Sequence, residues 1–177
     1  VAFYSLHDTF AGNSFIWVGP QWYLGLLTSP EFWWALGRSL LFSVLVLLVE
    51  VPLGIFIALR MPASGPWAGV LIVLIALPLL APQIVVGYIF KVLAAPHIGL
   101  LHAAFDAIGT GYDMNNRAVV WATLLLMDAW HWTSLVVLLC YAGLKAIPQD
   151  YYQAARIDGA RGWSVFRHIQ LPRLRRV

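Results

Sequence analysis

Three apolar runs constrain this sequence more than any other feature. They cover about residues 33–60, 67–90 and 118–144, and about 20 apolar residues in a helix suffice to cross the roughly 30 Å hydrocarbon layer of a membrane. Hydrophobic residues make up 61% of the chain and charged residues only 11%, whereas about a quarter of the residues in soluble domains are charged. The sequence therefore predicts an all-α membrane protein, a bundle of transmembrane helices.

The prolines and glycines indicate how the runs are shaped and joined. Residues 1–31 are mixed in character and broken by glycine and proline, which predicts a loop outside the membrane, near its interface. The second run contains Pro78 and Pro82. We expect a kinked helix packed against others there, because neighbouring groups must satisfy the carbonyls that proline leaves free. Residues 99–105 predict a short interfacial helix.

Charge predicts the orientation of the spans. The segment after the third run carries few acids, Asp150 and Asp158, against six arginines: Arg156, Arg161, Arg167, Arg173, Arg175 and Arg176. Positively charged short loops stay in the cytoplasm, so three crossings place residues 61–66 inside and residues 1–31 outside. Because the chain opens on Val1 and stops after a basic stretch, we expect an internal piece of a longer protein, with an external loop (1–31) and a membrane domain (32–177).

Several classes of chemistry find no support in the sequence. The single Cys140 lies in an apolar run and cannot form a disulfide within the chain, and no histidines have the paired spacing of a helical zinc site. The cluster Gly109-Thr110-Gly111 lacks the lysine of a phosphate-binding loop. We expect no catalytic residue, no metal and no nucleic-acid partner, since the basic tail is not interleaved with aromatic residues.

A loop at residues 148–172 follows the third run and predicts two short helices around a glycine hinge. Asp150 and Gln153 have the spacing of a capping box, which would begin the first helix, and Gly159 would end it in a left-handed conformation. Ala155 and Gly159 stand four residues apart, so we expect them to share a face on which their small size lets another backbone approach.

The second half of the loop is amphipathic. Trp163, Phe166 and Ile169 recur every three residues and predict an apolar stripe, which Leu171-Pro172 would close because the residue before proline avoids the helical region. The residues alone leave two interpretations open: a docking loop for a soluble partner, or an amphipathic pair of helices lying at the membrane interface.

The same loop resembles a family motif. Gln153-Ala154-Ala155, Asp158-Gly159-Ala160 and Ile169-Gln170-Leu171-Pro172 are similar, at matching spacing, to the Glu-Ala-Ala…Gly…Ile-x-Leu-Pro loop (the EAA motif) of binding-protein-dependent ABC importer permeases. Residues 128–133 and 99–101 resemble the carbohydrate branch. The resemblance implies a coupling helix that contacts an ATPase through Tyr152, Gln153, Ala154, Ala155, Asp158, Gly159, Ala160, Ile169, Leu171 and Pro172.

The resemblance also implies partners and a location. They are a cytoplasmic ABC ATPase dimer that holds ATP and Mg²⁺, a second permease subunit, a periplasmic solute-binding protein and membrane lipid, with the chain itself carrying no cofactor. The chain would lie in a bacterial inner membrane, with residues 1–31 periplasmic, and the substrate would be a sugar or polyol such as glycerol. One departure is that Gln153 replaces the family's glutamate, and a neutral amide cannot make the stronger charge-assisted contact.

Polar and aromatic residues in the spans are candidates for a substrate pathway. Asp128 and His131 share one face of the third run and should point into the protein, either lining the pathway or joining helices. Trp130 and Trp132 could stack on sugar rings, although packing is the commoner role. Glu50 is expected to pair with another helix. Two other functions stay open: an ion-coupled transporter with Glu50, Asp128 and His131 as a relay, and a non-transporting membrane scaffold.

Overall fold

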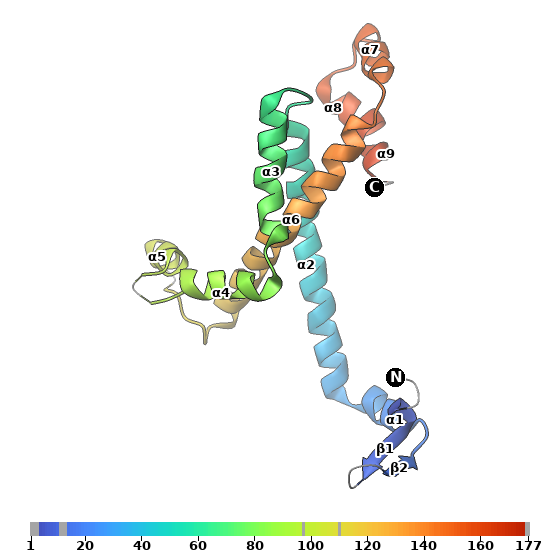
Figure 1. The fold of residues 1–177 in the computed structure, drawn as a ribbon, viewed down its shortest axis with the longest axis vertical. Coiled ribbons are helices and arrows are strands. Elements are labelled where there is room, and N and C mark those ends of the chain that lie inside the picture. The colour runs from blue at the N-terminus through green and yellow to red at the C-terminus, as the bar shows by residue number, and fades with distance from the viewer. Residues whose placement is uncertain (1–3, 11–13, 97, 110, 176–177) are drawn as a thin grey trace. The chain divides into compact units, whose positions relative to one another are not determined.

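The computed structural model describes residues 4–10, 14–96, 98–109 and 111–175. Within these ranges the chain is mainly helical, as the apolar runs predict (Figure 1). Thr110 of the glycine cluster and Arg176 of the basic tail lie outside them. The chain divides into two units, Val1–Val44 and Leu45–Val177, and each is described by itself.

The first unit contains a hairpin where the sequence predicts only a loop. His7 and Trp17 pair across two antiparallel strands, and their rings pack edge to face with centroids 5.0 Å apart. Cross-strand aromatic pairs of this kind stabilise short hairpins, and the separate segments give no sign of the pairing. The elements are η1 (Tyr4–Leu6), β1 (His7–Phe10), β2 (Ser14–Trp17) and α1 (Gln21–Thr28).

The first apolar run forms one long helix, α2 (Pro30–Arg60), which begins in the first unit and ends in the second. Its 31 residues span about 46 Å at 1.5 Å per residue, more than the hydrocarbon layer requires. At the start of α2, Ser29 Oγ accepts a 3.4 Å hydrogen bond from the Phe32 N–H. Its buried residues recur every fourth position and form one face: Val46, Glu50, Gly54 and Ala58.

That face of α2 comes into close contact with α6 (Arg117–Lys145) at Gly54. A Cβ at this position would lie 2.5 Å from Val136 Cγ1 and 3.3 Å from the Val137 nitrogen, so only glycine allows the two helices to come this near. Next to this contact lies the apolar core of the second unit, formed by Ala58, Val137, Cys140, Tyr141 and Leu174.

The second apolar run is two helices, and the single kinked helix expected over residues 67–90 is not what the structure shows. α3 (Pro66–Leu80) and α4 (Gln83–Leu93) meet at an angle of 92°. Ala81 is extended, with φ −75° and ψ 126°, because the ring of Pro82 disfavours a helical conformation in the residue before it. Pro78 lies inside α3 and does not end it.

The third apolar run, α6, is the central helix of the second unit. Asn116 Oδ1 caps its start by accepting the Ala118 N–H at 2.9 Å. α3, α4 and a short C-terminal helix all contact it, and Tyr141 Oη donates a 2.9 Å hydrogen bond to the Pro62 carbonyl in the turn before α3. The other elements are α5 (Leu100–Ala107), α7 (Gln149–Ile157), α8 (Gly162–Val165), η2 (Phe166–Gln170) and α9 (Leu171–Leu174).

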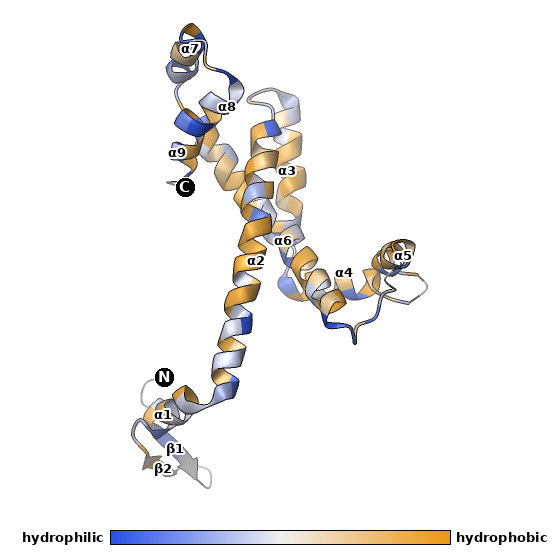
Figure 2. Ribbon diagram, turned by 180° about the vertical axis from the view of Figure 1, so that it is seen from behind, coloured by the Kyte–Doolittle hydropathy of each residue, from blue (hydrophilic) through white to orange (hydrophobic). Residues whose placement is uncertain are grey.

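Length and composition identify the helices that can cross a membrane. Among the described residues α2 and α6 each qualify alone, and α3 with α4 qualifies if the bent pair counts as one span. Figure 2 shows apolar residues along α3 and the second half of α2. Less than a third of the most apolar part of α2 or α6 is buried within the chain, which leaves wide surfaces for lipid or for other helices.

Candidate functional site

The first helix of the C-terminal loop, α7, begins at Gln149 and not at the position that the capping pattern predicts. Pro148 precedes it, and the Pro148 carbonyl accepts the Tyr151 N–H at 3.3 Å without a side-chain cap. Asp150 therefore lies inside the first turn, where its charge favours the positive end of the helix. The expected capping box between Asp150 and Gln153 is wrong because the cap position is occupied by proline.

The end of α7 follows the prediction closely. Gly159 has φ 68°, in the left-handed region where a residue without Cβ is not strained. The Ala160 N–H bonds to the Ala155 carbonyl at 2.8 Å, and the Gly159 N–H bonds to the Arg156 carbonyl at 3.1 Å. These two bonds form a Schellman motif, which satisfies the last carbonyls and turns the chain sharply.

Ala155 and Gly159 do not form a shared open face, so that expectation is wrong. Ala155 is buried against the rest of the second unit, whereas Gly159 is exposed and nothing lies within 4 Å of where its Cβ would be. The reason is that Gly159 follows the last helical residue in a left-handed conformation, so the four-residue spacing of a helix face no longer applies to it.

The outer surface of α7 and the glycine turn after it carry four of the ten predicted coupling residues, Gln153, Ala154, Asp158 and Gly159. Tyr152 is half-buried and accepts a weak 3.5 Å hydrogen bond from Gln170 Nε2, which places it on the inner side. Ile157 is 87% exposed and was not predicted, although an apolar residue at the end of a polar helix is a usable signal. The exposed residues of α7 and the turn after it are Asp150, Tyr151, Gln153, Ala154, Ile157, Asp158 and Gly159. Gln149 and Arg156 are also exposed, but they lie on the inner side of the helix, with Tyr152.

The second half of the loop is a continuous helix with a wide turn in it. α8, η2 and α9 run from Gly162 to Leu174, and η2 is a π-helical turn in which the Leu171 N–H reaches the Phe166 carbonyl. Leu171-Pro172 does not close the helix as expected. The wider turn precedes the proline, which has no N–H to give, and the helix continues until Leu174 is buried in the core beside Tyr141.

The predicted apolar stripe of this half is only partly covered. Trp163 is 71% exposed and its ring lies 5.4 Å from that of Phe166, centroid to centroid. Phe166 and Ile169 are half-buried. Of the remaining motif residues, Ala160 and Leu171 are half-buried and Pro172 is exposed.

The polar and aromatic candidates of α6 divide between two sides of that helix. Asp128, His131 and Trp132 line a hollow of about 300 Å³ together with Gln83, Val86 and Met127, between α6 and α4. Trp130 lies elsewhere, with its ring centroid 6.0 Å from that of Phe90, and lines an apolar cavity of about 660 Å³ between α2, α3 and α6. The structure thus brings three of the four candidates together.

Buried polar atoms without partners lie in the same spans. Among the described residues Glu50 Oε1, His131 Nδ1 and Thr133 Oγ1 are buried and have no hydrogen bond. Glu50 is 5% exposed and His131 is 6% exposed. An unsatisfied buried polar group costs about 1–3 kcal/mol. These atoms therefore call for a partner that this chain, as described, does not supply.

The chain matches known membrane transport proteins. The family model described as "Binding-protein-dependent transport system inner membrane component" matches residues 50–177. The trehalose/maltose transport system permease protein MalF of Thermococcus litoralis is 31% identical over 162 residues, which cover 90% of this chain and 55% of that protein. The arabinooligosaccharides transport system permease protein AraP of Bacillus subtilis is 28% identical, over 85% of this chain and 50% of that protein.

A solved structure has the same fold. A chain in the crystal structure of a bacterial ABC transporter involved in the import of the acidic polysaccharide alginate superposes with a TM-score of 0.75 at 22% identity, covering 89% of this chain and 57% of that one. The chain spans about half the length of the curated relatives that it matches.

Proposed function

Because the chain belongs to the family of binding-protein-dependent transport system inner membrane components, we propose that it is the transmembrane permease subunit of an ATP-driven importer of a sugar or polyol. Its similarity to permeases named for trehalose and maltose and for arabinooligosaccharides supports that substrate class, and glycerol is the smallest member that we include. The subunit makes and breaks no covalent bond. ATP and Mg²⁺ are held by a separate ATPase dimer.

The observation that carries this proposal is the helical loop after α6. α7 ends in a Schellman motif and presents an exposed surface around Gln153, Ile157 and Gly159, while the other half of the loop is anchored in the core by Leu174. An ATPase that grips the exposed surface could pull on the attached span. Closure of the ATPase dimer would then tilt α6 and switch the cavity from outward to inward access.

The contact with the ATPase is proposed to be mainly a matter of shape and hydrogen bonds. Gln153 is exposed and can donate and accept hydrogen bonds, but it has no charge to form an ion pair. Ile157 adds an exposed apolar side chain beside the glycine turn. The proposed mechanism therefore includes no ion pair between Gln153 and the ATPase.

The orientation is proposed from charge. Arg156, Arg161, Arg167, Arg173 and Arg175 lie in or beside the loop, and short positively charged segments remain in the cytoplasm. Residues 1–31 would then lie in the periplasm, where the solute-binding protein acts, and residues 32–177 would form the membrane domain beside a second permease subunit.

Asp128, His131 and Trp132 are proposed to line the substrate pathway. Their hollow combines a carboxylate, an imidazole, the Gln83 amide and an indole face, which suits a molecule that carries both hydroxyl groups and apolar C–H surface. Trp130 is left out of this group because it packs against Phe90. Asp128→Asn should lower substrate uptake much more than assembly of the complex, and Trp130→Phe, the matched control, should change uptake little.

Reconstitution of the full-length permeases with their ATPase and solute-binding protein tests the whole proposal. Uptake into proteoliposomes should require hydrolysable ATP and should persist when the proton gradient is collapsed. Uptake that continues without ATP but stops with the gradient would instead support an ion-coupled transporter, with Glu50, Asp128 and His131 as its relay. A complex that binds the ATPase but moves no solute under any condition would support a scaffold.

A further inference from the structure

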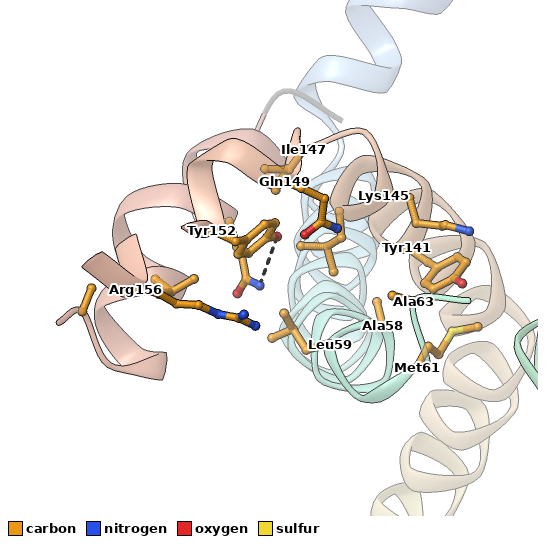
Figure 3. A pocket seen from close by; sticks show the side chains of 14 residues that line it. Ala58, Leu59, Met61, Ala63, Tyr141, Lys145, Ile147, Gln149, Tyr152 and Arg156 are labelled. Carbon is orange, nitrogen blue, oxygen red and sulfur yellow. Dashed lines mark hydrogen bonds between the residues drawn. The ribbon is translucent and has the colours of Figure 1, made fainter. Parts of the chain in front are cut away.

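A third cavity lies behind α7, away from the surface proposed to meet the ATPase. Its volume is about 460 Å³, and it is an open cavity lined by the inner side of α7, the ends of α2 and α6, the turn after α2, and residues of α8 and η2 (Figure 3). All of the residues that line it belong to the second unit. The mechanism proposed above does not use this space.

One side of the cavity is polar and carries positive charge. The Arg156 guanidinium points into it, as do the Tyr152 hydroxyl and the Gln149 amide (Figure 3). Gln170 lines it too, and its amide bonds to Tyr152. None of the residues that line the cavity is acidic, and no described carboxylate forms an ion pair with Arg156. The lining thus contains two cationic side chains, Arg156 and Lys145, and several neutral hydrogen-bonding groups, a set that suits an anion.

The other side of the cavity is apolar. The last turn of α2 supplies Ala58 and Leu59, and the end of α6 supplies Leu144, with Ile147 just beyond it. Val165 closes the wall from α8. A small hydrated anion gains nothing from contact with apolar side chains. A molecule that joins an anionic group to a hydrocarbon chain can contact both sides of the cavity favourably.

The cavity also lies at the ends of two spans. Arg60 is the last residue of α2 and its guanidinium carbon lies 4.3 Å above the Phe56 ring; Lys145 is the last residue of α6, and its ammonium lies 5.5 Å above the Tyr141 ring. A cation and an aromatic ring together are typical of the level where lipid headgroups meet the hydrocarbon. The cavity, lined by Leu59 of α2 and Lys145 of α6, lies next to that level.

We propose that this cavity binds the phosphate of an anionic membrane phospholipid through Arg156, with the apolar wall receiving the upper part of an acyl chain. Basic pockets between spans on the cytoplasmic side are suited to such headgroups. The occupied site would support α7 from behind. It requires that the spans cross a membrane and that α7 lies on its cytoplasmic side, but it does not depend on which solute is transported.

The test compares two arginines in the full-length complex. Arg156→Gln removes the cation that points into the cavity, and Arg167→Gln removes an exposed cation that does not line it. In nanodiscs that mix phosphatidylglycerol with phosphatidylcholine, native mass spectrometry should show roughly fivefold less phosphatidylglycerol retained by the Arg156 variant. Arg156→Lys should retain an intermediate amount, and the Arg167 variant should equal the wild type.

Hydrogen exchange separates the lipid from free phosphate. The amides of α7 should be protected by phosphatidylglycerol in the wild type and not in the Arg156 variant, while inorganic phosphate added to pure phosphatidylcholine discs should give no protection. Protection by inorganic phosphate alone would overturn the lipid assignment. An equal loss of phosphatidylglycerol from both arginine variants would also overturn it, because general surface charge would then explain the binding.

Discussion

Substitutions at Gly159 can separate two effects: one on the proposed docking of α7 to the ATPase, and one on the stability of the end of α7. Its φ of 68° is unfavourable for an L-residue by roughly 1–2 kcal/mol, although Asn and Asp tolerate this region better than Ala. No atom of the described residues beyond its chain neighbours lies within 4 Å of a Cβ at this position. A substitution here therefore causes no clash within the described chain, and any effect beyond the backbone strain must come from a partner.

Three variants distinguish backbone strain within α7 from a clash with a partner. Gly159→Ala should weaken the end of α7 by about 1 kcal/mol and lower uptake slightly. Gly159→Asn adds bulk with less strain and should lower uptake partially. Gly159→Asp has nearly the same shape as Asn but adds a charge that must lose water at the interface, so it should abolish ATP-driven uptake while membrane insertion is retained.

The assays are uptake into proteoliposomes and co-purification of the ATPase with the permease. Wild-type and Asn complexes should retain the ATPase, and the Asp complex should lose it. Normal uptake and normal ATPase binding by the Asp variant would refute the docking surface. If Ala lowers uptake as much as Asp does, the defect lies in the end of the helix, and the docking interpretation fails.

Two further predictions concern helix packing and the motif. Gly54→Ala should destabilise the membrane domain by about 1–3 kcal/mol, measured by thermal unfolding in detergent, because its Cβ would overlap Val136 Cγ1. Val136→Ala should rescue it only in part, since Val136 Cβ would still be 2.7 Å away; full rescue or no initial loss would contradict the packing. Gln153→Glu should strengthen ATPase binding if the ATPase presents a cation there, and weaker binding would show that the amide is preferred.

The span pattern and the turn chemistry of this protein could be predicted from its sequence. Apolar runs locate α2 and α6 because crossing a membrane requires length and hydrophobicity, both of which are local properties. Gly159 likewise marks a left-handed helix end because the backbone requirement and the residue that meets it occupy the same position.

The sequence predictions are wrong where packing between distant residues, or an irregular helix turn, determines the structure. The 92° bend at Pro82 could be suspected as a kink, but its size depends on how α3 and α4 pack against α6. The cap of α7 was misplaced because Pro148 allows an earlier start. The sequence predicts that the helix stops at Pro172, but a π-helical turn just before it, which carries no simple sequence signal, lets the helix continue. Proximity in the chain places Trp130 beside Asp128, whereas in the structure the two residues line different hollows.

The burial of Leu174 has a mechanical consequence for the loop. The chain leaves α6 at Ile147, which is buried, passes through α7 and the glycine turn, and is fixed again beside Tyr141 by Leu174. If the loop were anchored at one end only, it could move without moving α6, and a force on α7 would not be transmitted. Because both ends of the loop are fixed to α6, a force applied to α7 would be transmitted to α6 as a torque.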